Sequence, residues 1–436
     1  MSSDPLFANP ENNAEVPEIA PAPIQSSQRI VSLDVLRGTA LLGILVINIG
    51  VYALPGDSQF SPLLVGGTGS LNLSIWGIGT LLFFQKMMAL FSMLFGAGIV
   101  LQLSKNSDNE SLVSKIFFRR QRWLIIIGLL HAYLFWWGDI LFFYGVCGII
   151  VYLFRNLKAR SIIITGLLIM CVTVPLFWGI SALMEYSRDM MTTGEEGSLS
   201  NVWKEASASF NPTPEDLQKE IDDHTGSYND LFFARAERAI MAQTGMLLFY
   251  AMWRVCGLML IGMGLMKLRF FTAELPVRTY AITLAIGYGI GFLLSVFGLY
   301  SIITSGYDPI VGLRVMGVDD YIGSLFVSIG HASLIMIIIK SEVLMFLTDR
   351  LAAIGRVALS NYLFHTLVFT TVFYGYGLGL FGRFERFELA LMVLAMWLFQ
   401  LIVSPIWLRF YRFGPFEWLW RIVTYRKVPK FKRSVE

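Results

Sequence analysis

Histidine is scarce in this chain of 436 residues, so its few imidazoles are the first candidates for acid–base chemistry. The four histidines are His131, His224, His331 and His365. His131 stands out because Asp139 follows it within the apolar stretch WLIIIGLLHAYLFWWGDILFFYG. An imidazole can take up a proton near neutral pH, and a carboxylate can orient it, so this pair can act as a catalytic base. Two other interpretations stay open: a histidine satisfied by packing, and an aspartate that only caps the next helix.

Three more polar side chains interrupt the first long apolar stretch, LDVLRGTALLGILVIN at residues 33–48. Asp34 and Arg37 are three residues apart, so on a helix they share one face and can form an ion pair or contact a ligand. Asn48 follows Arg37 after eleven helical steps. Those steps return to within about 20° of the same face, roughly 16 Å further along the axis. Arg37 and Asn48 are therefore predicted to mark two levels of one inward-facing stripe.

Arg254 lies in the middle of another apolar stretch, LLFYAMWRVCGLML. Because arginine keeps its proton, this side chain needs an anion, a carboxylate or water as its partner. We expect it to bind substrate or to pair with a carboxylate, with a side chain that reaches the membrane surface as the alternative. Asn361 and His365, in ALSNYLFHTLVF, are further candidates for binding substrate or cofactor. The three cysteines lack metal-ligand spacing, so no metal site is predicted.

The elements that must hold these side chains are predicted to be membrane-spanning helices. The chain is 55% hydrophobic and 15% charged, whereas a soluble domain carries about 25% charged residues. Several apolar stretches reach about 20 residues, the length that crosses a bilayer core. They lack the two-residue alternation of a membrane barrel. The expected fold is all-α, a polytopic bundle of about 10 transmembrane helices. The predicted spans are 33–54, 86–104, 118–137, 139–155, 161–184, 243–266, 278–299, 319–339, 355–376 and 388–409.

The basic residues predict the orientation of the bundle. Most of the 34 lysines and arginines lie on one side if the N-terminus is cytoplasmic. Cytoplasmic loops carry such an excess, so both ends of the chain are expected inside. The net charge of +3 does not suggest nucleic acid as a partner. The predicted parts are a disordered tail at 1–28, transmembrane halves at 29–184 and 243–425, an external loop at 185–242, and a basic cytoplasmic tail at 426–436 that anionic lipid attracts.

Five motifs in order resemble the bacterial YeiB-like family of membrane proteins. They are LDVLRGTALLGILVIN, FFQKMMALFSMLFGAGIVL, GLLHAYLFWWGDILFFYGVCGI, GRVALSNYLF and FGPFEWLWRIVTY. The resemblance covers about residues 29–427. It implies a multi-pass protein of the bacterial cytoplasmic (inner) membrane.

More distantly, that family is similar to membrane acyltransferases, including the lysosomal enzyme that acetylates heparan glucosamine. Bacterial enzymes that acylate cell-surface sugars carry an arginine, ten residues and a catalytic histidine in the first span. Here Arg37 matches the arginine, and Asn48 stands in place of the histidine. The resemblance implies that His131 serves as base or acyl carrier with Asp139 as its orienting group. It further implies that Asn48 binds the reacting carbonyl or the acceptor, and that Arg37 and Arg254 hold donor phosphates.

The resulting expectation is an acyltransferase that uses acetyl-CoA or another acyl-CoA from the cytoplasm. Its acceptor would be a glycan or a lipid-linked molecule near the outer face. Two alternatives stay open: a carrier of a small anionic or sugar-like substrate, with Arg254 and His131 along the path, and a non-catalytic membrane scaffold. Beyond the lipid bilayer and acyl-CoA, association with further copies of the chain is also left open.

Overall fold

The computed structural model describes residues 30–56, 58–59, 62–104, 110–194, 203 and 212–433. The predicted tail at 1–28, the end of the basic tail and the middle of the predicted external loop lie outside these residues. Within them the chain is helical, and its only extended pairing is an isolated bridge between Tyr411 and Lys432. The prediction of an all-α membrane bundle is confirmed.

The helices follow one another with short connections. The first half contains α1 (Val31–Ala53), α2 (Ser70–Leu82), α3 (Lys86–Ser104), α4 (Glu110–Leu134), α5 (Leu141–Val151), α6 (Ala159–Cys171) and α7 (Thr173–Thr193). The second half begins with α9 (Pro214–Thr225), α10 (Tyr228–Met241), the π-helical segment η3 (Ala242–Ala251) and α11 (Met252–Lys267). It continues with α12 (Val277–Thr304), α13 (Pro309–Gly317), α14 (Asp319–Ser341), α15 (Met345–Arg356), α16 (Ala358–Phe373), α17 (Arg386–Phe410) and α18 (Pro415–Tyr425).

Each of the ten predicted spans coincides with a helix. Among the described residues, seven helical segments are long and apolar enough to cross a membrane, or eight if α15 and α16, which meet at an 80° bend, count as one broken span. α4 and α5 fall outside this count, because basic residues crowd the first half of α4 and α5 has only 11 residues. The number of crossings near ten therefore stays a prediction.

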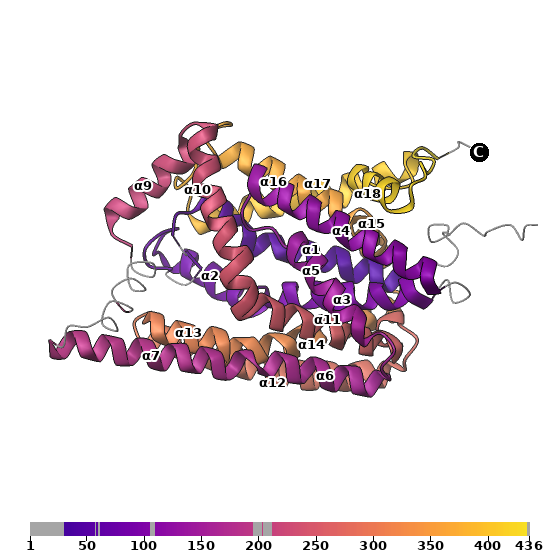
Figure 1. Cartoon of the computed structure of the whole chain (residues 1–436), viewed down its shortest axis with the longest axis horizontal. Coiled ribbons are helices and arrows are strands. Elements are labelled where there is room, and N and C mark those ends of the chain that lie inside the picture. Colours follow the sequence, from indigo (N-terminus) through magenta and orange to yellow (C-terminus); the bar gives the residue numbers. More distant parts are fainter. Residues whose placement is uncertain are drawn as a thin grey trace, which may run out of the picture.

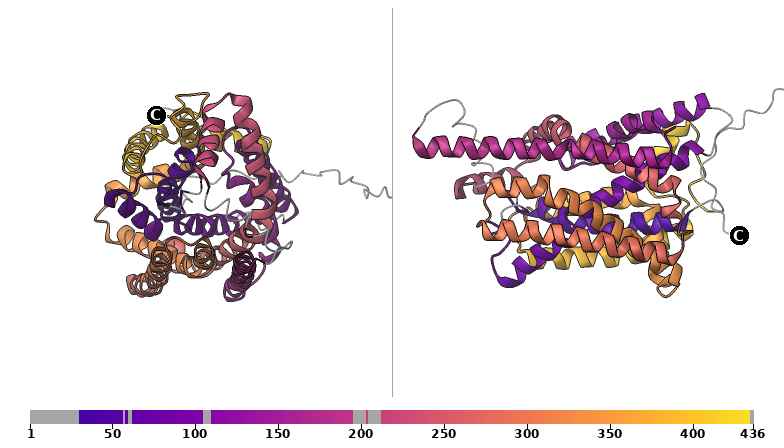
Figure 2. Two further views of the ribbon diagram at one scale, coloured as in Figure 1. Left: turned by 90° about the vertical axis from the view of Figure 1, so that its left-hand side faces the viewer. Right: turned by 90° about the horizontal axis from the view of Figure 1, so that it is seen from below.

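The helices run mostly side by side along the longest axis of the molecule (Figure 1, Figure 2). α1 begins, α3 ends and α18 lies at the right-hand end in Figure 1, which also carries the C-terminus. We call this the basic end, since the predicted cytoplasmic lysines and arginines cluster there. α9 and α10 cover the opposite end, and α6, α7, α12, α13 and α14 form a layer along the lower side of the view.

Glycines allow the helices around α1 to approach closely. A Cβ atom on Gly355 of α15 would overlap the carbonyl oxygen of Asp34, and one on Gly38 of α1 would overlap that of Leu351. Small residues of this kind let backbones pack directly in membrane bundles. α15 therefore lies against the first turns of α1, where Asp34 and Arg37 are located.

Much of the predicted external loop is helical. α7 continues to Thr193 instead of ending at residue 184, and an ion pair of 2.6 Å between Arg188 and Asp308 ties its outer part to the start of α13. α9 and α10 each begin with a capping box, built on Thr213 and Ser227. Such reciprocal caps satisfy the first amide groups of a helix, which explains why these polar segments fold as helices.

Candidate functional site

The hairpin of α4 and α5 brings His131 and Asp139 together. His131 lies in the last turn of α4, and its Nδ1 is 2.9 Å from Oδ1 of Asp139 in the turn that follows. The other carboxylate oxygen, Oδ2, accepts a hydrogen bond of 2.7 Å from the Phe142 amide in the first turn of α5. Both side chains are buried. Asp139 thus orients the imidazole and also caps the next helix, so the two interpretations left open by the sequence hold together.

Two hydroxyl groups extend this pair into a chain of four side chains, which we call the buried relay. Nε2 of His131 is 2.9 Å from Oγ1 of Thr366 on α16, and Thr366 Oγ1 is 2.8 Å from the hydroxyl of Tyr52 on α1. With an ionised Asp139 against Nδ1, that nitrogen carries the proton and Nε2 is the acceptor. Thr366 then donates to His131, and Tyr52 donates to Thr366.

Aromatic rings enclose the buried relay. The ring of Trp136 lies 4.2 Å from that of Tyr52, and the ring of Tyr362 lies 5.3 Å from that of His131. Phe369 stacks on Tyr52 from the other side at 5.9 Å. Thr366 is 1% exposed and His131 is 3% exposed. Electrostatic interactions are stronger in such a water-poor setting, so the hydrogen-bonded order of the relay is well defined.

A cavity of about 310 Å³ extends from the basic end into the bundle. Its outer walls include Ile30, Leu101 and Gln102, and its inner end is formed by Ile140, Leu141, Tyr144 and Tyr362. Leucine, isoleucine and phenylalanine side chains line the space between. A pocket with a polar mouth and an apolar interior is suited to an amphiphile whose charged group stays at the surface.

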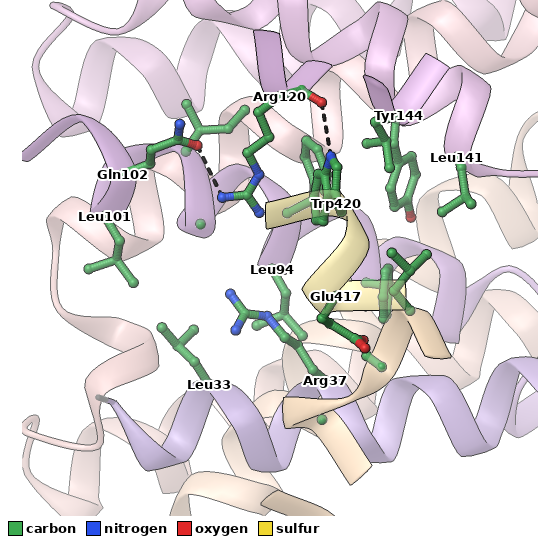
Figure 3. Close-up of a pocket in the computed structure, with 18 of the residues that line it drawn as sticks. Leu33, Arg37, Leu94, Leu101, Gln102, Arg120, Leu141, Tyr144, Glu417 and Trp420 are labelled. Atoms are coloured by element: carbon green, nitrogen blue, oxygen red, sulfur yellow. Dashed lines mark hydrogen bonds between the residues drawn. The ribbon is translucent and has the colours of Figure 1, made fainter. Parts of the chain in front are cut away.

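Four arginines line this cavity near the basic end: Arg37, Arg120, Arg356 and Arg421. Arg37 on α1 and Arg120 on α4 point into it from opposite sides (Figure 3). Arg120 donates a 3.2 Å hydrogen bond to Gln102 and lies 4.4 Å from the ring centre of Trp420. Arg37 pairs with Asp34 at 3.2 Å, yet its side chain stays 28% exposed. Guanidinium groups bind phosphate oxygens in pairs, so this mouth is suited to a phosphorylated ligand.

Helix α18 closes one side of the cavity. The carboxylate of Glu417 accepts hydrogen bonds from the amide, at 3.0 Å, and the hydroxyl of Ser360 in the first turn of α16. Burial raises the pKa of Glu417 above its ordinary value. Trp420 donates to the carbonyl oxygen of Arg120 at 3.2 Å and so fixes α18 to α4. Because Glu417 faces the start of α16, where helix dipoles favour an anion, it leaves the arginines available to a ligand.

The cavity ends one helical turn away from the buried relay. Tyr362, at its inner end, and Thr366 are four residues apart on α16, about 6 Å along the axis. On α1 the cavity is lined by Leu33, Asp34, Arg37, Leu41 and Ile44. Asn48 continues this stripe one turn beyond Ile44, and Tyr52 follows one turn later. Asn48 therefore lies at a level between the cavity and the relay.

Comparisons with known proteins show where the chain belongs. A family model described as "Protein of unknown function (DUF418)" matches residues 265–427. A much longer similarity joins the chain to "Uncharacterized protein YeiB" of Escherichia coli (strain K12), with 32% identity over 405 residues that cover 92% of this chain and 97% of the relative. The chain belongs to the YeiB-like family. It is a multi-pass membrane protein.

Other relatives extend the comparison of this YeiB-like chain. "Uncharacterized protein YxaH" of Bacillus subtilis (strain 168) is 29% identical over 425 residues, which cover 92% of this chain and 96% of the relative. A 39.9 kDa protein encoded in the amylase 3′ region of Bacillus acidopullulyticus is 25% identical over 412 residues, with 93% and 97% covered. No solved structure matches the chain.

The site of this YeiB-like protein is assembled from both halves of the sequence. The DUF418 match contains Tyr362, Thr366 and Glu417, whereas Arg37 and His131 come before it. The similarity to the Escherichia coli relative, which covers 92% of the chain, extends well beyond that match. The cavity and the relay therefore depend on contacts between the two halves.

Other residues singled out in the sequence lie elsewhere. Arg254 is fully buried between α11 and α14, where it donates to the carbonyl oxygen of Tyr321 at 3.2 Å and to Ser324 at 2.6 Å. Near it, the buried Lys86 pairs with Asp320. We call these residues the α14 polar cluster, and they are not among the residues that line the cavity.

Asn361 and His365 lie on α16 next to residues of the site. Asn361 donates to Ser404 of α17 at 3.2 Å, and His365 is 2% exposed. Neither belongs to the described walls of the cavity, whereas Asp34 and Arg37 do. Sequence reasoning missed Tyr52, Thr366 and Arg120. The motif GRVALSNYLF and helical spacing point to Tyr362, but nothing in the sequence distinguishes Thr366 from the other threonines of α16.

Proposed function

We propose that this YeiB-like protein is a membrane acyltransferase. It takes the acyl group of a cytoplasmic acyl-CoA, such as acetyl-CoA, and delivers it to an acceptor near the outer face. One observation carries the proposal: a cavity with an arginine-lined mouth at the basic end stops one helical turn short of a buried His131–Asp139 pair. Charged donor, apolar passage and proton-transfer group then follow one another along one line.

The chemistry assigns a task to each part of the line. Arg37 and Arg120 bind the phosphates of the donor, and the apolar wall holds its pantetheine arm and acyl chain. His131 takes the proton from the attacking hydroxyl as the thioester carbonyl is attacked, and gives it to the departing thiolate. Asp139 keeps the imidazole in the tautomer that can accept this proton. The amide of Asn48, which lies level with the gap between cavity and relay, hydrogen-bonds the carbonyl or the acceptor.

The proposal carries three expectations about the cellular setting. The basic end faces the cytoplasm, and the membrane is the bacterial inner membrane. The acceptor is a glycan or a lipid-linked molecule. Acyl-CoA reaches the cavity from the cytoplasmic side, where it is made soluble by its phosphates.

The first test is binding of acetyl-CoA to the purified full-length protein in lipid nanodiscs. Arg37→Gln and Arg120→Gln each remove a charge-assisted contact of about 1.5–3 kcal/mol, which raises the Kd roughly tenfold or more. Acetyl-pantetheine, which lacks the nucleotide phosphates, is expected to bind the variants and the native protein equally. The matched control is Arg269→Gln, since Arg269 lies at the basic end, pairs with Glu274 at 3.0 Å and is not among the cavity residues.

The second test measures turnover with radiolabelled acetyl-CoA and bacterial membrane glycans and lipids as acceptors. Labelled acceptor and free CoA are expected, and His131→Ala abolishes both. Absence of CoA binding together with absence of CoA release would sink the proposal. Substrate flux across proteoliposomes that His131→Ala alters, without CoA binding, would instead favour a carrier.

A further inference from the structure

We propose that Thr366 is the nucleophile that carries the acyl group between donor and acceptor. This inference rests on the proposed function. Asp139, His131 and Thr366 follow one another with separations of 2.9 Å and 2.9 Å, each across a different ring nitrogen of the histidine. A carboxylate, an imidazole and a hydroxyl in this order are the arrangement by which acyl-transfer enzymes activate an alcohol.

The direction of the hydrogen bonds suits a nucleophile. Thr366 donates its proton to Nε2 of His131, so its oxygen gains nucleophilic character when the imidazole withdraws that proton. Tyr52, 2.8 Å from the same oxygen, donates to it from the other side. Once a carbonyl carbon has bonded to Thr366 Oγ1, the Tyr52 hydroxyl lies close to the oxygen on which negative charge develops.

The occupied Nε2 also limits how His131 can act. Both of its ring nitrogens already have partners within hydrogen-bond distance, Asp139 on one side and Thr366 on the other. A proton that reaches Nε2 without rearrangement of the relay therefore comes from Thr366. Direct action of His131 on an external hydroxyl would require Thr366 to leave this contact first.

Tyr362 lies between the cavity and the relay. Its side chain lines the inner end of the cavity and its ring lies 5.3 Å from the ring of His131. Thr366 follows one turn later on the same helix. A thioester that enters from the basic end reaches Thr366 when the Tyr362 ring turns aside, so Tyr362 limits access of water to the nucleophile.

The first half-reaction transfers the acyl group to the protein. Thr366 Oγ1 attacks the thioester carbonyl, and its proton moves to Nε2 of His131, where Asp139 stabilises the resulting imidazolium. The carbon–sulfur bond breaks, and the CoA thiolate takes the proton from His131. The products are a Thr366 ester, free CoA and a neutral His131.

The second half-reaction restores the protein. A hydroxyl of the acceptor attacks the ester carbonyl and gives its proton to His131. The bond between the acyl carbon and Thr366 Oγ1 breaks, and Thr366 recovers the proton from His131. No oxidant, metal or further reactant is needed to balance either step.

The test is covalent labelling of the full-length protein in nanodiscs with acetyl-CoA and no acceptor. Acid quenching followed by mass spectrometry is expected to show one acetyl group on the peptide that contains Thr366, with release of one equivalent of CoA. Thr366→Val, which keeps the shape and removes the hydroxyl, is expected to abolish labelling and to lower turnover on the order of a hundredfold or more. Thr366→Ser is expected to retain both.

Thr370→Val is the matched control, because Thr370 lies one turn further on α16, is equally buried, and uses its hydroxyl to bond the Thr366 carbonyl oxygen at 2.7 Å. It is expected to keep the label. Turnover with CoA release but no acyl group on the protein, retained by Thr366→Val, would overturn the nucleophile and leave the acyltransferase intact. Absence of both CoA binding and CoA release would overturn the two together.

Discussion

Replacing Asp139 with asparagine is expected to reverse the tautomer of His131. Oδ2 of Asp139 accepts the 2.7 Å hydrogen bond from the Phe142 amide. An asparagine must place its oxygen at this position, because its NH2 group would meet another donor there. The NH2 group then faces Nδ1 of His131, which becomes an acceptor, and Nε2 carries the proton. Nε2 now donates to Thr366 and can no longer take its proton.

The size of the effect follows from what each property loses. Loss of general-base catalysis costs about 10²–10⁴ in rate, a rise of roughly 3–5 kcal/mol in the barrier. Stability changes much less, since the Phe142 amide keeps its acceptor and one hydrogen bond contributes about 1 kcal/mol. Asp139→Asn is therefore expected to bind acetyl-CoA normally, unfold within a few degrees of the native protein, and release CoA at least a hundredfold more slowly.

The assay is CoA release under single-turnover conditions, with thermal unfolding measured in the same nanodiscs. The control is Asp308→Asn, an aspartate that caps α13 through the amides of Ile310 and Val311 and has no histidine beside it. Its CoA release is expected to equal that of the native protein. If Asp139→Asn releases CoA at the native rate, or loses activity only in proportion to acetyl-CoA binding, the relay has no catalytic role.

Three further predictions concern stability. In the α14 polar cluster, Lys86→Met leaves Asp320 buried without its cation and is expected to cost about 3–5 kcal/mol in chemical unfolding, whereas the double variant with Asp320→Leu recovers most of this loss. Burial raises the pKa of Glu417, so the folded state holds this proton more tightly and the stability it contributes falls as pH rises from about 4.3 through the raised value; Glu417→Gln is expected to remove that fall in Tm. Gly355→Ala would drive a Cβ into the Asp34 carbonyl oxygen, separate α15 from α1, and cost about 1–3 kcal/mol in the same unfolding assay.

Local sequence patterns were sufficient for the helices and for the parts of the site that lie on one helix or one hairpin. Apolar stretches gave a helix at each predicted span because backbone hydrogen bonds must be satisfied internally in lipid. The three-residue spacing of Asp34 and Arg37 predicts their ion pair, and the structure contains it. His131 and Asp139 meet because a short turn joins their helices.

Contacts between distant segments were beyond these patterns. Thr366 meets His131 across 235 residues of sequence, and only the packing of α16 against α4 brings the two together. Arg254 required a partner, but periodicity could not reveal that its hydrogen bonds go to Tyr321 and Ser324 of α14. The 80° bend between α15 and α16 occurs near Val357 without a proline, so no breaker residue announces it.

The most direct test of the central claim is to locate a bound donor by electron cryomicroscopy. The full-length protein in nanodiscs would be imaged with a non-hydrolysable thioether analogue of acetyl-CoA. The account predicts phosphate density between Arg37 and Arg120, an extended arm along the apolar wall, and the analogue's acyl end beside Tyr362, close to Thr366. An empty cavity at saturating analogue, or an analogue bound with its nucleotide away from these arginines, would contradict it.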